Sequence, residues 1–295
     1  MSRFLDPAVL GALSGLDLVA KTVVDGWVAG LHRSADFGFS HEFAEYRAYT
    51  PGDDLRDIDW NVLARSDRTY VKRYHGETNG LLTLLLDASN SMNYASHAVS
   101  KMNYARFMAA ALFYLAIRKQ RDAAGILVFD DEVRDYIKPS TRHGQLLRLL
   151  SSLELAEPRA RTNFEEPLRH LEGLLRRRGI VVMLSDFYET PRTIIRALEP
   201  LRFRGNEVVL FHVLDPTEFR PQLGGPTVLF DLETRARMEV TADYVAKEYS
   251  ERISRHIEAL RDGAQRAGMS YHLLPTDQPL DGALREYLAV RQGRP

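Results

Sequence analysis

Residues Leu81 to Met92 read LLTLLLDASNSM, and this stretch decides the fold. Five of its first six residues are apolar, which is typical of a strand buried on both faces of a parallel sheet. The apolar run ends in Asp87, Ser89 and Ser91. Ligands of open α/β sheets bind at the carboxyl ends of strands, so these side chains are candidates for a site. Their oxygen atoms favour a hard divalent cation such as magnesium over zinc.

The same residues also have a plainer interpretation. A strand-to-helix turn often carries an Asp or a Ser whose side chain caps the following helix. The pattern Asp-x-Ser-x-Ser leaves both interpretations open, since about one chain in ten of this length contains it by chance. The buried-strand signal directly before it favours the ligand site.

Length and composition are those of an ordinary globular chain. The 295 residues, 45% hydrophobic and 27% charged, suffice for one large or two modest domains. The formal net charge of -1 gives no long-range attraction to nucleic acid or to an anionic membrane, so we expect neither as a partner. The chain has no cysteine, no apolar stretch of ~20 residues and no signal pattern, so we expect a cytoplasmic protein without direct membrane insertion.

The chain before the central strand is expected to form an N-terminal extension, residues 1–79. It begins with a helix from Asp6 to Leu31, whose apolar stripe predicts docking on the main domain. The rest is aromatic, charged and turn-rich, with a strand from Thr69 to Tyr74. Mixed charges around Trp60 are more typical of a structural ion-pair network than of a catalytic site. Residues 80–295 are expected to form the main domain.

Within the main domain, strand-like runs alternate with helical patterns, which predicts an α/β fold with a doubly wound, Rossmann-like, mostly parallel sheet. Only Asp130 and Asp131 join the second strand to the third, so we expect that pair to be antiparallel. An added β-hairpin is expected within residues 227–240. The expected strands of the sheet are 81–86, 124–129, 132–137, 180–184, 208–214 and 270–274, and the expected helices are 103–120, 144–153, 167–178, 193–201, 242–267 and 280–288.

A second carboxylate follows another buried strand. The run IVVML, residues 180–184, leads into Ser185 and Asp186. In a doubly wound sheet the first strand and the strand after the third helix are neighbours at the switch point. We therefore expect Asp87 and Asp186 to lie close together, with Thr162 reaching the same place from the intervening loop.

Five of these oxygen-bearing side chains resemble, in order and approximate spacing, the complete metal-ion-dependent adhesion site of von Willebrand factor A domains. They are Asp87, Ser89, Ser91, Thr162 and Asp186. The segments EFAEYRAYTPGDDLRDIDW, ARSDRTYVKRY and TDQPLD are in addition similar to the bacterial A-domain family catalogued as domain of unknown function fifty-eight. The likeness extends from about Val19 to Tyr287.

The resemblance implies a sheet of the von Willebrand factor A type that binds Mg²⁺ or Mn²⁺. Ser89 and Ser91 would bind the ion directly, Thr162 directly or through water, and the two aspartates mainly through water. Magnesium wants six oxygens, which leaves a position that an Asp or Glu of a protein partner fills. The resemblance also implies a partner, an AAA ATPase of the MoxR type, and a role in assembling or maturing other proteins.

Four residues are candidates for a partner-binding rim around this site. Arg159 and Arg161 would attract an acidic partner, or they serve only the solubility of their loop. We expect Asn163 to brace the loop and Tyr188 to shape the rim.

Two other functions remain open. A magnesium-dependent phosphohydrolase could use Asp87 as its nucleophile, but the haloacid-dehalogenase-like pattern needs a second Asp two residues on, where this chain has Ser89. No Walker-type phosphate loop and no G-x-S-x-G elbow is present. In a metal-free scaffold, the polar cluster would be vestigial and residues 32–79 would bind the partner. We expect a metal-ion-dependent protein–protein interaction module rather than an enzyme.

Overall fold

Two compact units make up the chain. Unit 1 contains residues 1–28 and 80–295, and unit 2 contains residues 29–79. The expected extension, residues 1–79, is thus divided between them. The computed structural model describes residues 6–31, 43–50, 58, 62, 69–74, 80–159, 163–175, 177–220, 227–230, 237–240 and 248–292.

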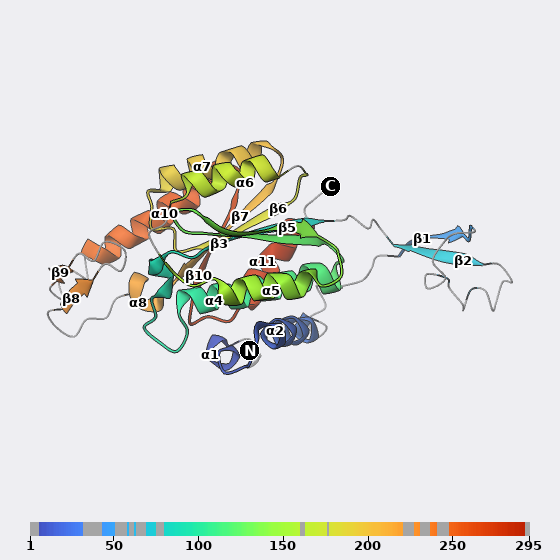
Figure 1. The fold of residues 1–295 in the computed structure, drawn as a ribbon, viewed down its shortest axis with the longest axis horizontal. Coiled ribbons are helices and arrows are strands. Elements are labelled where there is room, and N and C mark those ends of the chain that lie inside the picture. The colour runs from blue at the N-terminus through green and yellow to red at the C-terminus, as the bar shows by residue number, and fades with distance from the viewer. Residues whose placement is uncertain are drawn as a thin grey trace. The chain divides into compact units, whose positions relative to one another are not determined.

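A six-stranded sheet forms the centre of unit 1 (Figure 1). The strand order is β10-β7-β6-β3-β4-β5, with β3 (Leu81–Asp87) beside β6 (Ile180–Ser185). Neighbouring strands are parallel except for β4 and β5, which are antiparallel as their short joint predicted. The order confirms the doubly wound, mostly parallel sheet of the von Willebrand factor A type, and it places β3 and β6 at the switch point.

Most other elements agree with the expected ones to within a few residues at most ends, but the expected N-terminal helix is interrupted between Leu10 and Leu16, and the short helix at Pro216–Phe219 was not expected. The sheet also contains β4 (Ala123–Phe129), β5 (Val133–Ser140), β7 (Glu207–Leu214) and β10 (Ser270–Pro275). The helices are α1 (Pro7–Leu10), α2 (Leu16–Leu31), α4 (Lys101–Tyr114), α5 (Gln145–Leu155), α6 (Glu165–Leu174), α7 (Pro191–Phe203), α8 (Pro216–Phe219), α10 (Ser250–Arg266) and α11 (Asp281–Gln292). A 3-10 turn, η3 (Asn90–Asn93), follows β3, and a π-helical turn, η4 (Leu115–Lys119), continues α4.

Two small antiparallel pairs accompany the main sheet. The expected hairpin is present as β8 (Thr227–Phe230) and β9 (Arg237–Val240). In unit 2, β2 (Tyr70–Tyr74) pairs with β1 (Phe43–Ala48), a strand that we did not expect. Trp60 and most charged residues around it lie outside the described residues.

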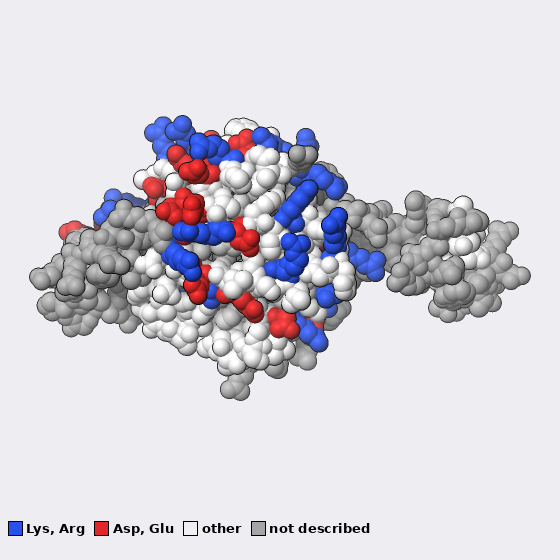
Figure 2. Space-filling view, viewed as in Figure 1, with Lys and Arg blue, Asp and Glu red and all other residues white. Residues whose placement is uncertain are grey.

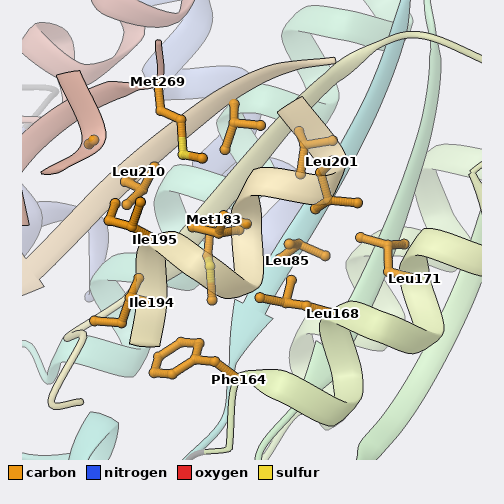
Figure 3. Close-up of a cluster of buried hydrophobic side chains, with 14 of the residues drawn as sticks. Leu85, Phe164, Leu168, Leu171, Met183, Ile194, Ile195, Leu201, Leu210 and Met269 are labelled. Atoms are coloured by element: carbon orange, nitrogen blue, oxygen red, sulfur yellow. The ribbon is translucent and has the colours of Figure 1, made fainter. Parts of the chain in front are cut away.

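Helices cover both faces of the sheet (Figure 1). On one face, side chains of β3, β6 and β7 meet those of α6, α7 and α10 in a core that Figure 3 shows from close by. Leu85, Met183 and Leu210 come from the three strands, and all are fully buried. On the opposite face α4 is buried along most of its length. Both faces of β3 are therefore covered, which explains its unbroken apolar run.

Residues 6–28 of the N-terminal helices belong to unit 1 and pack against its other elements, as their apolar stripe predicted. Val19, Val23 and Trp27 of α2 are buried. The backbone N–H of Leu16 donates to a carboxylate oxygen of Glu154 on α5 at 3.5 Å. In the described part of the chain, no helix combines the length and the apolar character needed to cross a membrane.

Candidate functional site

Aspartates stand at the carboxyl ends of the four inner strands of the sheet. They are Asp87, Asp130, Asp186 and Asp215, and all four are fully buried. The two outer members brace loops. Asp130 accepts from Nε of Arg134 at 2.8 and 2.7 Å, and Asp215 accepts from the backbone N–H and the hydroxyl of Ser96 at 2.7 and 2.5 Å. The two central members, on β3 and after β6, form the candidate site.

Asp87 accepts hydrogen bonds from the loop that follows β3 and from the end of β6. Its Oδ1 accepts from the backbone N–H of Ser89 at 2.9 Å, and its Oδ2 accepts from the hydroxyl of Ser185 at 2.5 Å. Burial and, after it, the negative charge of Asp186 raise the pKa of Asp87 to about 7, although the hydrogen bonds oppose both effects. The structure thus brings the two carboxylates of adjacent strands into electrostatic contact, and the site carries excess buried negative charge.

The two serines after β3 lie together beside this pair. The hydroxyl oxygens of Ser89 and Ser91 are 3.1 Å apart, and the two residues are 0% and 7% exposed. Backbone bonds fix their loop, because the N–H of Ala88 donates to the carbonyl of Phe129 and the N–H of Arg159 donates to the carbonyl of Ala88. Adjacent ligands of an octahedral Mg²⁺ at ~2.1 Å would be about 3 Å apart, so the hydroxyl spacing matches one edge of such a shell.

The two carboxylate oxygens of Asp186 differ in their hydrogen bonding. Its Oδ2 accepts from Nζ of Lys101 at 2.8 Å, while its Oδ1 is buried without a hydrogen-bond partner among the described residues. The same ammonium donates to Oε1 of Glu218 at 2.6 Å. Burial lowers the pKa of Lys101, but Asp186 and Glu218 outweigh this and raise it above the usual value. Lys101 is therefore a buried cation at the site.

The sequence analysis did not single out Lys101, Glu218 or Ser185. Lys101 opens α4 directly after the capping residue Ser100, where the helix dipole disfavours a cation, and that misfit was an available signal. Ser185 precedes Asp186 at the end of a buried strand. Glu218 gave no signal, since α8 has only four residues.

Buried aromatic rings support the loops that follow β4 and β6. Phe164 lies 5.9 Å from Phe129 and 6.0 Å from Phe187 between ring centroids. Phe187 directly follows Asp186 and adopts a left-handed backbone with φ of 51°. Nε2 of His256 on α10 is hydrogen-bonded to the Phe187 carbonyl at 3.0 Å. These contacts fix the backbone from which Asp186 projects.

The loop between β3 and α4 is tied to the opposite half of the sheet. Ser96 binds Asp215 at the end of β7, as described above. Nε2 of His97 shares a hydrogen bond of 2.8 Å with the hydroxyl of Thr276, directly after β10. The loop is therefore anchored to two further strand ends.

The predicted rim is described only in part. Arg161 of the rim lies outside the described residues, as does Thr162, which was predicted as a metal ligand. Arg159 is exposed and pairs with Glu157 at 2.7 Å, which offsets its positive charge. Asn163 accepts from the backbone N–H of Glu165 and so braces the start of α6. Tyr188 is 42% exposed, and its ring centroid lies 4.7 Å from Nζ of Lys101.

The residues present fit a Mg²⁺ or Mn²⁺ ion. One edge of the sheet carries the buried carboxylates of Asp87 and Asp186, and one oxygen of Asp186 has no hydrogen-bond partner among the described residues. The same edge carries the hydroxyls of Ser89 and Ser91 at the spacing of adjacent octahedral ligands. Within the described ranges, no three Asp, Glu or His side chains gather closely enough to hold a metal by themselves. An ion here would depend on the serine hydroxyls, which suits a hard cation that keeps water ligands.

Comparisons with known proteins identify relatives of the whole chain. The sequence profile of the family described as "Protein of unknown function DUF58" matches residues 45–259. An uncharacterized protein of Mycobacterium tuberculosis (strain H37Rv) and one of Mycobacterium bovis are each 28% identical over 292 residues. The alignment covers 98% of this chain and 86% of each relative.

Solved structures with a similar arrangement include the conserved hypothetical protein BatB of Bacteroides thetaiotaomicron, at 13% identity and a TM-score of 0.49 over 72% of this chain and all of that chain. The SpRpn10 VWA domain is 12% identical, with a TM-score of 0.43 over 73% of this chain and 98% of that domain.

Proposed function

The chain belongs to the family described as "Protein of unknown function DUF58", and we propose that it acts as a metal-ion-dependent protein–protein interaction module. The observation that carries the proposal is the polar cluster at the switch point, where the ends of the neighbouring strands β3 and β6 present the paired hydroxyls of Ser89 and Ser91 and a buried oxygen of Asp186 that has no hydrogen-bond partner among the described residues. Buried polar atoms in proteins are nearly always paired, so an orphan at a sheet edge marks a place for an ion or its water.

In this proposal, Ser89 and Ser91 hold Mg²⁺ or Mn²⁺ directly, with Thr162 from the adjoining loop. Asp87 and Asp186 hold water molecules of the ion by hydrogen bonds. When bound, the ion supplies a Lewis-acidic position that takes a carboxylate from the partner. A shell with few direct carboxylates leaves that position electron-poor, so the site favours recognition over hydrolysis.

The proposal excludes Asp87 as an attacking nucleophile. Both of its oxygens accept hydrogen bonds from Ser89 and Ser185, and the residue is fully buried. The hydrogen bonds and the burial lower the nucleophilicity of this carboxylate, whereas a second lone pair on each oxygen can still accept a hydrogen bond from a water of the ion shell. The residues therefore support binding better than a phosphohydrolase reaction.

We propose a MoxR-type AAA ATPase as the partner, in the cytoplasm, with this chain as an adaptor in the assembly or maturation of other proteins. The support for this part is the resemblance to the family. The exposed ring of Tyr188 and the exposed side chain of Arg159 would lie at the rim of the interface.

Calorimetric titration with Mg²⁺ and Mn²⁺ tests the metal dependence. Wild type should bind one ion, and a Ser89→Ala plus Ser91→Ala variant should bind it at least about tenfold more weakly, because both direct ligands are lost. Ser14→Ala plus Ser151→Ala is the matched control, since both serines are exposed. Wild type that shows neither heat nor thermal stabilisation at millimolar ion would refute the proposal and favour a metal-free scaffold.

The partner is tested with the purified ATPase. Wild-type protein should retain it in the presence of Mg²⁺ and release it when a chelator is added, whereas the Ser89→Ala plus Ser91→Ala variant should not retain it. Retention that is the same with chelator, and the same for the variant, would contradict a metal-dependent interface.

A further inference from the structure

We propose that Lys101 is a positioning residue that shares Asp186 with the metal ion and keeps this carboxylate from ligating the ion directly. The inference rests on the function proposed above and explains how the bound ion can still attract a partner's carboxylate. It states why the ion keeps enough positive charge to take a carboxylate from the partner.

Lys101 is a buried cation whose ammonium is paired with two carboxylates. Its side chain is fully buried, and its Nζ donates to Asp186 Oδ2 at 2.8 Å and to Glu218 Oε1 at 2.6 Å. The ring centroids of Tyr188 and Tyr94 lie at 4.7 and 5.9 Å from the same nitrogen. Lysine is almost never fully buried unless it is paired, so this ammonium is held in place by the acidic pair and the two rings.

The position of Lys101 opposes local preference. It is the first residue of α4, where the partial positive charge of the helix dipole makes a cation unfavourable by ~0.3–1 kcal/mol. On the face that Figure 2 shows, many other lysines and arginines lie at the surface, some of them beside acidic side chains. The local structure of α4 therefore does not explain a lysine at this position. Its ion pairs with Asp186 and Glu218 do explain it.

The division of the Asp186 oxygens distinguishes this arrangement from a structural ion pair. A buried ion pair is stable when the remaining lone pairs are also satisfied. Here the ammonium binds one oxygen, and the other oxygen remains orphaned among the described residues. One side of Asp186 is thus committed to Lys101, and the free side is available to a water of the ion shell.

The consequence is a pair of opposite effects on two binding steps. Without the ammonium, Asp186 gains a free oxygen and the site loses a positive charge, so the metal ion should bind more tightly. The ion would then be more neutralised by the protein, so an added carboxylate should bind more weakly. A merely structural lysine would weaken both steps when removed.

Lys101→Met tests this, because methionine fills similar space without charge. Mn²⁺ is the probe, titrated by calorimetry and by electron paramagnetic resonance. The variant should bind Mn²⁺ about tenfold more tightly, since a cation beside a carboxylate changes that group's affinity for another cation by ~10-fold or more. Acetate added to the Mn²⁺-loaded variant should bind more weakly than to the loaded wild type. Lys119→Met is the control, because Lys119 is 37% exposed and pairs with Asp25 on the surface.

The outcomes separate this inference from the proposed function. Tighter Mn²⁺ binding by folded Lys101→Met supports the inference, even where wild type binds too weakly to detect. If wild type binds Mn²⁺ and the folded variant binds it equally or more weakly, the inference is overturned and the proposed function stands. If neither protein binds Mn²⁺, both are overturned.

Glu218→Gln keeps the test decisive if Lys101→Met does not fold. Glutamine is nearly the same size, and its carbonyl oxygen can still accept from the N–H of Asp215, as Glu218 does at 2.9 Å. The ammonium would then be committed to Asp186 alone, and Mn²⁺ should bind several-fold more weakly. Unchanged or tighter binding by Glu218→Gln would overturn the inference.

Discussion

Replacing Asp87 with asparagine should make the metal-free protein more stable than wild type at pH 8 and should change its stability little at pH 5. Burial and Asp186 raise the pKa of Asp87 from 3.8 to about 7 in the folded protein. Between these two values the folded state keeps the proton and the unfolded state loses it. The stability that protonated Asp87 contributes is therefore present below the unfolded pKa and is lost as the pH rises through the folded one.

The magnitude follows from the two pKa values. At ~1.4 kcal/mol per unit, ionising Asp87 costs the folded state about 4 kcal/mol in full, of which about 3 kcal/mol falls between pH 5 and pH 8. Asparagine has no such cost, but it cannot accept the hydroxyl proton of Ser185 in the same way, which costs about 1 kcal/mol at any pH. Asp87→Asn should thus be stabilising by about 2–3 kcal/mol at pH 8.

Urea unfolding of both proteins in chelator, from pH 5 to pH 8, measures this difference. Titrating groups that do not interact with Asp87 are common to both proteins and cancel in the comparison. Saturating Mg²⁺ should restore the stability of wild type at pH 8 by more than that of the variant, because the ion offsets the buried negative charge. A stability difference that does not vary with pH would show that Asp87 titrates normally, and the reasoning would fail.

Three further changes test the supports of the site. Phe164→Ala removes the ring between Phe129 and Phe187 and should destabilise the protein by about 3–5 kcal/mol in urea unfolding, so a loss under about 1 kcal/mol would contradict the packing described. Ser185→Ala removes the hydroxyl that donates to buried Asp87 and accepts from the N–H of Phe187, and should cost about 1–3 kcal/mol, whereas Ser151→Ala, on the surface, should stay within about 0.5 kcal/mol of wild type. Asp215→Asn weakens the tie to Ser96, so amide hydrogen exchange of the 94–100 loop should accelerate while the β3 amides stay protected, and unchanged exchange in the loop would argue that other contacts hold it.

The sheet and half of the site could be predicted from the sequence because their signals are local. An apolar run such as 81–86 shows that it is buried on both faces, and a carboxylate directly after it stands at the ligand edge. The pairing of β3 with β6 follows from the doubly wound order, which placed Asp186 beside Asp87. These steps need only neighbouring residues and one topological rule.

The rest of the site depends on tertiary contacts that no local pattern encodes. Lys101 meets Glu218 across 117 positions of the chain, and that contact exists only because α8 follows β7 near the start of α4. β1 was missed for a similar reason, since FAEYRA becomes a strand by pairing with β2. Such contacts required the structure.

The ties from Ser96 to Asp215 and from His97 to Thr276 have a consequence for how the chain can be shortened or altered. The loop that carries the hydroxyl pair is not free to move independently of the sheet, because hydrogen bonds at its far end attach it to the ends of β7 and β10. A deletion that removes β10 and Thr276 would remove the hydrogen bond of His97, although β10 begins almost 180 positions downstream of Ser91. The strands at the C-terminal edge of the sheet thus help to fix the position of the loop that carries Ser89 and Ser91.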